Sequence, residues 1–219
     1  MARQRDRHVV LRERLIDAAE RTIAANGLAG LRARDLAGEA GCAVGTIYNV
    51  FEHLDELILC VGLRTLTMLD TALEAGRLAR PYGSTEDAAD DLVRLALAYL
   101  EFAAGHTVRW RALFEHRMSE ARPLPQWFVE QQHALFAQVE RPLVTLLPDL
   151  DPDARRILAR TLFSAVHGIV ALGLEEKLVS LPFSDLRDQL AAAVRAITTG
   201  RVELRSIGAS GGRGDVPRC

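Results

Sequence analysis

The sequence predicts an all-α protein with a small three-helix domain at its N-terminus and a larger helical bundle after it. Leucine, alanine and arginine are abundant, whereas aromatic residues make up only 5 % of the chain, a balance that favours helices over sheets. Apolar residues recur three and four positions apart, which is the period of one helix face. No segment shows the apolar-polar alternation of a half-buried strand.

The N-terminal region predicts three helices. The first covers residues 7–26, and Gly27 ends it as a C-cap. Two short helices at about 33–40 and 44–50 follow, separated by a glycine-containing turn at 41–43. A helix of two turns is barely stable alone in water, so its neighbours must support it. We expect that support from a miniature core of Leu15, Ala19, Ile23, Leu31, Leu36, Ala37, Ala40, Cys42, Ile47 and Phe51.

Two short helices joined by a turn that contains glycine predict a DNA-binding helix-turn-helix. The second of them leaves polar side chains pointing outward, and their hydroxyl and amide groups can hydrogen-bond phosphates and base edges. Val44 can contact a thymine methyl group, and Gly45 permits a close approach because it has no side chain. The predicted DNA contacts are Arg32, Arg34, Val44, Gly45, Thr46, Tyr48 and Asn49.

The rest of the chain predicts further helices. A helix covers about 54–76, and Ser84 is the expected N-cap of the next one. Residues 92–104 are apolar almost all round, so we expect this helix at the centre of the larger domain. More helices are predicted at about 107–118, 126–146, 152–177 and 183–199. The glycine-rich residues 206–219 are predicted to be a disordered tail.

The TetR family of transcriptional regulators has a DNA-binding signature that residues 27–57 resemble: GLAGLRARDLAGEAGCAVGTIYNVFEHLDEL. The shared pattern runs through an Ala-Gly turn to Gly-Thr-x-Tyr-x-x-Phe and a following Leu. Residues 162–170, LFSAVHGIV, are similar to the Trp-His-Gly type of TetR C-terminal domain, with Val166 in place of Trp. The resemblance implies a homodimeric repressor that binds a palindromic DNA operator and is released by a small, largely apolar effector.

The same resemblance implies what the two parts of the chain do. It assigns residues 1–53 to a helix-turn-helix DNA-binding domain and residues 54–205 to a ligand-binding and dimerisation domain. The family dimerises through its last two helices, for which we expect contacts from Leu158, Leu162, Leu186 and Leu190. The helices before them surround an apolar pocket in the family, for which we expect contacts from Trp110, Phe114, Trp127, Phe128 and His167.

The chain departs from the family pattern in ways that weaken the predicted DNA binding. Arg32, Ala43 and His53 stand where the family has N-capping side chains, each of which contributes about 1 kcal/mol. Leu54 stands where the family has a phosphate-binding lysine. Up to residue 54, eight arginines face seven acidic residues. A helical ligand sensor or interaction protein with weakened or lost DNA binding therefore remains an alternative.

The sequence argues against an enzyme. Glu130 and His133 form one Glu-x-x-His, half of a di-iron site, but no second copy exists. The three cysteines lack metal-ligand spacing. The N-terminus leads into charged sequence instead of an apolar signal core, and no stretch approaches the ~20 apolar residues of a membrane span. We expect a cytoplasmic protein with no catalytic residues, metal, cofactor or membrane partner.

Overall fold

A computed structural model of the protein describes residues 2–118, 123–175 and 181–199. These residues form α-helices and one 3₁₀ turn, η1 (Leu28–Gly30), and contain no strand. The predicted all-α class is confirmed. The helices are α1 (Ala2–Asn26), α2 (Ala33–Ala40), α3 (Val44–Val50), α4 (Leu54–Gly76), α5 (Thr85–Gly105), α6 (Thr107–Glu115), α7 (Gln126–Leu146), α8 (Pro152–Gly173) and α9 (Phe183–Thr199).

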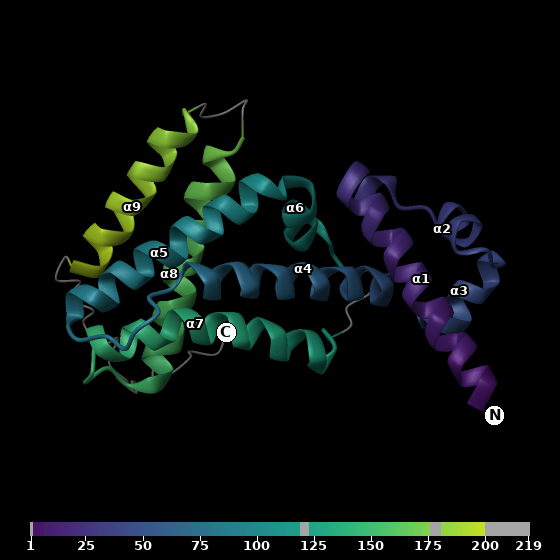
Figure 1. Ribbon diagram of the computed structural model, residues 1–219, viewed down its shortest axis with the longest axis horizontal. Helices are drawn as coiled ribbons and strands as arrows, with labels where there is room; N and C mark the ends of the chain where they lie inside the picture. Colours follow the sequence, from purple (N-terminus) through teal and green to yellow (C-terminus); the bar gives the residue numbers. More distant parts are fainter. Residues whose placement is uncertain (1, 119–122, 176–180, 200–219) are drawn as a thin grey trace, which may run out of the picture.

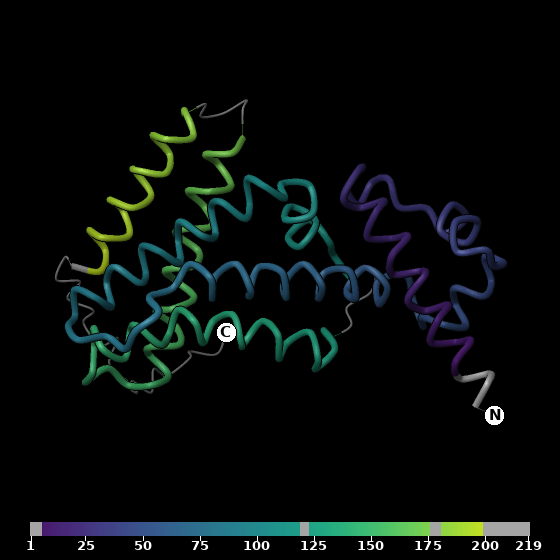
Figure 2. Tube along the Cα trace, in the orientation of Figure 1, coloured from purple at the N-terminus to yellow at the C-terminus, as the bar shows by residue number. Residues whose placement is uncertain are grey.

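The helices form two bodies connected by α4 (Figure 1). Helices α1, α2 and α3 make a small unit at one end, and the N-terminus lies at its tip, as the trace in Figure 2 also shows. Helix α4 runs from this unit into the larger bundle, where it packs between α5 and α7. Helix α5 contacts α4, α6, α7, α8 and α9, which confirms its predicted central place.

The core of the small unit contains the residues predicted for it. Leu15, Ala19, Ile23, Ile47 and Phe51 are at most 1 % exposed, and the other predicted members join the same cluster. Side chains from α4 and α6 also enter this core: Leu57, Cys60, Val61 and Ala112. A division of the chain between residues 53 and 54 therefore stays a prediction, because the first turns of α4 pack with the helices before it.

Local signals set most helix ends. Gly27 and Gly41 have φ angles of 66° and 70°, in the left-handed region that glycine adopts without a Cβ clash. The Ser84 hydroxyl accepts the backbone N–H of Asp87, and the Asp151 carboxylate caps α8.

The structure also shows where the helix ends depart from expectation. The N-cap residues of α2, α3 and α4 form no side-chain cap, as their identities predicted. Helix α6 ends three residues earlier than predicted, because His116 is already extended. Helix α8 ends at Gly173, four residues before the predicted end at 177, because Leu174 already leaves the helix. The predicted tail at 206–219 lies outside the described residues.

A buried ion pair joins α4 to α5 at the end of the bundle away from α1. Asp91 is fully buried, and its carboxylate accepts hydrogen bonds from the Arg77 guanidinium at 3.0 Å and the Tyr82 hydroxyl at 2.6 Å. The other carboxylate oxygen of Asp91 accepts the backbone N–H of Leu78 at 2.8 Å. Arg77 also donates to the Gln138 carbonyl in α7 at 3.3 Å. One carboxylate thus holds the ends of α4 and α5 together.

Candidate DNA-binding and ligand-binding sites

Helix α3 presents one face to solvent and buries the other. Ile47 is completely buried, and so is Phe51 just after the helix. Tyr48 is 52 % exposed and Val44 is 41 % exposed on the opposite face. Gly45 and Asn49 are exposed as well, while Thr46 is half-buried. The structure therefore brings the predicted reading residues of α3 onto one surface, and their contact with DNA stays a prediction.

The two arginines predicted to bind phosphate differ in the structure. Arg34 is exposed on the first turn of α2 and forms no ion pair with any described residue. Arg32 instead donates to the backbone carbonyls of Ala29 and Leu31 at 2.6 and 3.0 Å, so its guanidinium holds the turn before α2. Leu54, at the family's lysine position, is half-buried and packs against the core of the small unit.

A charge network neutralises acidic residues of α1. The Arg64 guanidinium in α4 lies 2.7 Å from the Glu13 and Asp17 carboxylates and 2.5 Å from Glu20. Arg109 in α6 lies 2.6 Å from the other Glu20 oxygen. Three of the seven acidic residues found up to residue 54 are therefore paired with arginines from outside the small unit. The net charge of the small unit together with its bound arginines is therefore more positive than the sequence count suggested.

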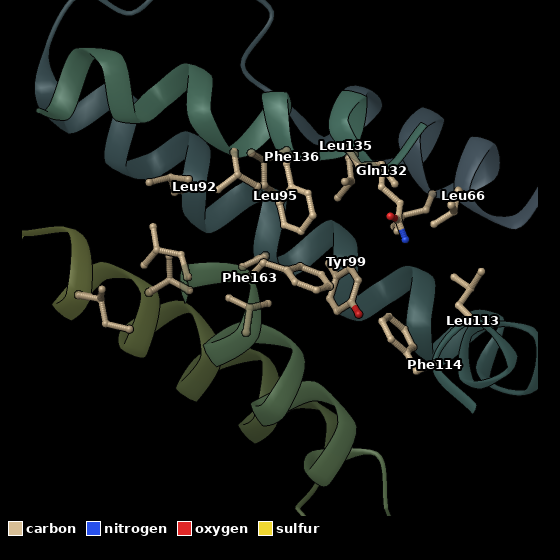
Figure 3. Close-up of a pocket in the computed structure, with 18 of the residues that line it drawn as sticks. Leu66, Leu92, Leu95, Tyr99, Leu113, Phe114, Gln132, Leu135, Phe136 and Phe163 are labelled. Atoms are coloured by element: carbon tan, nitrogen blue, oxygen red, sulfur yellow. The ribbon is translucent and has the colours of Figure 1, made fainter. Parts of the chain in front are cut away.

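The larger bundle contains a partly open cavity of about 210 Å³ between α4, α5, α6, α7, α8 and α9 (Figure 3). Among the lining side chains that the structure describes, only Tyr99, Gln132 and Thr198 are polar, and none carries a charge. Of the predicted ligand contacts, Phe114 and Phe128 line the cavity. An apolar cavity with a few polar groups is the usual form of a small-molecule site.

The other predicted ligand contacts lie behind the cavity wall. Trp127 packs edge-on against Phe128 at 5.8 Å between ring centroids. The Trp110 indole N–H donates to the Tyr99 hydroxyl at 2.9 Å, and a second hydrogen bond joins that hydroxyl to His167 Nδ1 at 2.8 Å. Burial lowers the pKa of His167, so its imidazole is neutral at neutral pH. Trp110 and His167 thus position Tyr99.

Sequence reasoning missed three residues that shape the cavity. Tyr99 is the one polar aromatic side chain in the otherwise apolar middle of α5. Gln132 stands four residues after Phe128 and four before Phe136, so all three share one face of α7. Phe163 in α8 packs edge-on against both Tyr99 and Phe136. The spacing of Gln132 between two aromatic residues was the signal available in the sequence.

The residues predicted to form the dimer interface lie largely in the core of the protomer. Leu162, Leu186 and Leu190 are only 9 %, 2 % and 0 % exposed within one protomer, and Leu162 lines the cavity. Leu158 is half-buried against the same core. These leucines follow helical spacing, but that spacing cannot tell a partner's surface from the protomer's own core. The burial of these side chains is what one protomer alone shows, and their part in a dimer interface stays a prediction.

A helix-turn-helix with an exposed second helix, joined to a helical bundle that contains a cavity, is an arrangement typical of helical transcription regulators. Residues 15–61 match the family model described as bacterial regulatory proteins, tetR family. Residues 92–202, just over half of the chain, match the tetracyclin repressor-like C-terminal domain. The chain belongs to the TetR family of transcriptional regulators. The Trp-His-Gly subtype is compatible with these matches and stays a prediction.

Solved structures share the fold at low sequence identity. A protein of unknown function from Rhodococcus sp. RHA1 is 24 % identical, with a TM-score of 0.65 over 84 % of this chain and 93 % of that one. A tetR-family transcriptional regulator from Streptomyces coelicolor is 19 % identical, with a TM-score of 0.61 over 86 % and 81 %.

A second Rhodococcus RHA1 structure, a bacterial regulatory protein in the tetR family, is 17 % identical. Its TM-score is 0.57 over 84 % of this chain and 95 % of that one. No curated protein matches the chain.

Proposed function

We propose that this chain is a homodimeric repressor, which binds a palindromic operator through α3 and releases it when a small apolar effector fills the cavity. The observation that carries the proposal is the position of α6 between the two bodies. Ala112 packs into the core of the small unit, and its neighbours Leu113 and Phe114 line the cavity. A ligand in the cavity therefore contacts the helix that also contacts α1.

Release of DNA follows if the ligand prefers a second arrangement of α6 and α4. Arg64 and Arg109 bind α1 from these two helices, so a shift of either helix moves the small unit. Two α3 helices must lie about 34–36 Å apart to enter successive major grooves of one operator. The ligand acts by binding one arrangement more tightly than the other, because equal affinity for both would leave the equilibrium between them unchanged.

The second candidate function is a ligand sensor that no longer binds DNA. Two observations favour it: Arg32 is held by its own backbone, and Leu54 packs inward where the family has a lysine. The neutralised acids of α1 favour the repressor instead. We also propose that the protein is non-enzymatic and cytoplasmic, where its operator is found. Glu130 and His133 are simply exposed on α7.

Binding to the DNA upstream of its own gene separates the two candidates. We expect the purified protein to bind that fragment more tightly than unrelated DNA in a fluorescence anisotropy titration. The logarithm of the affinity should fall linearly with the logarithm of the salt concentration, with a slope of roughly −0.9 per phosphate contact. Equal affinity for unrelated DNA of the same length, at every salt concentration, would support the sensor instead.

The exposed face of α8 is our candidate for the dimer interface. Ile157 is 66 % exposed and Leu172 is 53 % exposed, and Thr161, Ala165 and Gly168 lie between them on the same face. By length and composition alone α8 could cross a membrane, but only 11 % of its most apolar stretch is buried in the protomer. We propose that a second copy of α8 covers this face, because large apolar surfaces left exposed mark interaction sites.

Replacing Ala165 with arginine tests this interface. Ala165 is exposed in the protomer, so Ala165→Arg should leave the fold intact and place a charge at the centre of the contact. We expect the variant to be monomeric in sedimentation velocity at concentrations where the unmodified protein is dimeric. Ala137→Arg, on the exposed face of α7, is the matched control and should stay dimeric. A dimeric Ala165→Arg protein would place the interface elsewhere.

A further inference from the structure

No described side chain that lines the cavity can neutralise a charged ligand. All of its lining side chains are hydrocarbon except those of Tyr99, Gln132 and Thr198. His167 lies behind Tyr99, and burial lowers its pKa, so it supplies no positive charge at neutral pH. An ionised group without a partner is strongly disfavoured in such surroundings.

Two arginines near the cavity make contacts with other groups of the protein. Arg160 is exposed to solvent and stacks over the Phe136 ring at 5.6 Å from its centroid. Arg111 is paired with the Glu175 carboxylate at 3.0 Å. Neither guanidinium lines the cavity. The described residues therefore leave a bound carboxylate without a counter-charge.

Two of the three polar side chains that line the cavity lie toward one end. In Figure 3 the Gln132 amide and the Tyr99 hydroxyl lie on the side of Leu66, Leu113 and Phe114, away from Leu92. No described residue hydrogen-bonds the half-buried Gln132 amide. The other two polar residues already have partners. The Tyr99 hydroxyl is hydrogen-bonded to Trp110 and His167, and the Thr198 hydroxyl donates to the Val194 carbonyl in its own helix at 2.9 Å. The cavity thus has one hydrocarbon end and one uncharged polar end beneath α6.

We infer that the cavity binds an uncharged amphiphile, whose hydrocarbon part lies between α5, α8 and α9 and whose single hydrogen-bonding head group is held by Gln132, beside Tyr99. The cavity volume of about 210 Å³ restricts the ligand to a small molecule, such as a medium-chain alcohol or amide. The role of this molecule as the effector rests on the proposed function. Its binding in the cavity does not depend on that function.

A set of probes with the same chain and different head groups tests the inference. Octan-1-ol is neutral, whereas octanoate is an anion and octan-1-amine a cation at neutral pH. Calorimetric titration of the full-length protein, without DNA, should show octan-1-ol binding at least about tenfold more tightly than either ion. Binding of octanoate or octan-1-amine within about threefold of octan-1-ol would overturn the inference, and so would no binding of octan-1-ol.

Substitutions of Gln132 test the head-group position. Gln132→Leu should weaken octan-1-ol by about tenfold, because the head group loses its partner, and should leave n-octane unchanged. Gln132→Lys should reverse the preference, so that octanoate binds more tightly than octan-1-ol. Gln131→Leu, one residue away and outside the cavity lining, should change neither affinity.

Unchanged octan-1-ol binding in Gln132→Leu would show that the head group lies elsewhere and would overturn this assignment. The proposed function is tested separately by DNA release: octan-1-ol that binds the cavity without altering operator affinity would contradict effector control of repression and leave this inference standing.

Discussion

Replacing Asp91 with alanine is expected to lower the free energy of unfolding by about 3–5 kcal/mol, the usual effect of removing one partner of a buried ion pair. The side chain of Arg77 is only 5 % exposed, so its guanidinium would remain buried without an anion. The Tyr82 hydroxyl and the Leu78 backbone N–H would lose their acceptor as well. Urea unfolding followed by circular dichroism, at one fixed protomer concentration, measures the loss.

The neighbouring Asp90 provides the matched control. It forms an ion pair with Arg195 at 2.9 Å, but both side chains are about half exposed. Asp90→Ala should therefore change the free energy of unfolding by no more than about 1 kcal/mol. The double variant Arg77→Met/Asp91→Leu should recover part of the stability lost in Asp91→Ala, because it removes both charges. Equal losses for Asp90→Ala and Asp91→Ala would show that the buried network is not an anchor of the bundle.

Replacing Tyr48 with alanine is expected to weaken operator binding by about thirtyfold. That figure follows from a loss of about 1 kcal/mol in each of the two half-sites of a dimer. Tyr48 is 52 % exposed and no described residue hydrogen-bonds its hydroxyl, so its removal should leave the fold unaffected. Fluorescence anisotropy with the operator fragment measures the affinity, and the melting temperature checks the fold.

Two controls separate the parts of the Tyr48 effect. Tyr48→Phe keeps the ring and removes the hydroxyl, so an intermediate affinity would assign part of the effect to a hydrogen bond. Val144→Ala shortens an equally exposed side chain on α7 and should leave the affinity unchanged. If Tyr48→Ala bound the operator as tightly as the unmodified protein, Tyr48 would not contact DNA.

The candidate sites show how far sequence patterns reach. The apolar face of α3 and the exposed Tyr48 could be predicted, because neighbours along one short helix determine which side is buried. The partners of Arg64 could not, because Glu13, Asp17 and Glu20 lie more than forty positions away in the chain. The count of charged residues in the small unit was correct. The ion pairs with Arg64 show that three of its acidic side chains are neutralised by an arginine from outside the unit.

The sequence by itself determined the helices and the helix-turn-helix. The bounds of α2, α3, α4, α7 and α9 follow from residues within a few positions, because backbone hydrogen bonds and caps are local interactions. Tertiary structure alone decided what each helix face meets. Leu186 and Leu190 turned inward to the protomer's own core, while Gln132 became the polar end of a cavity. Periodicity shows which side chains share a face, and only the packing of distant helices supplies the surface opposite that face.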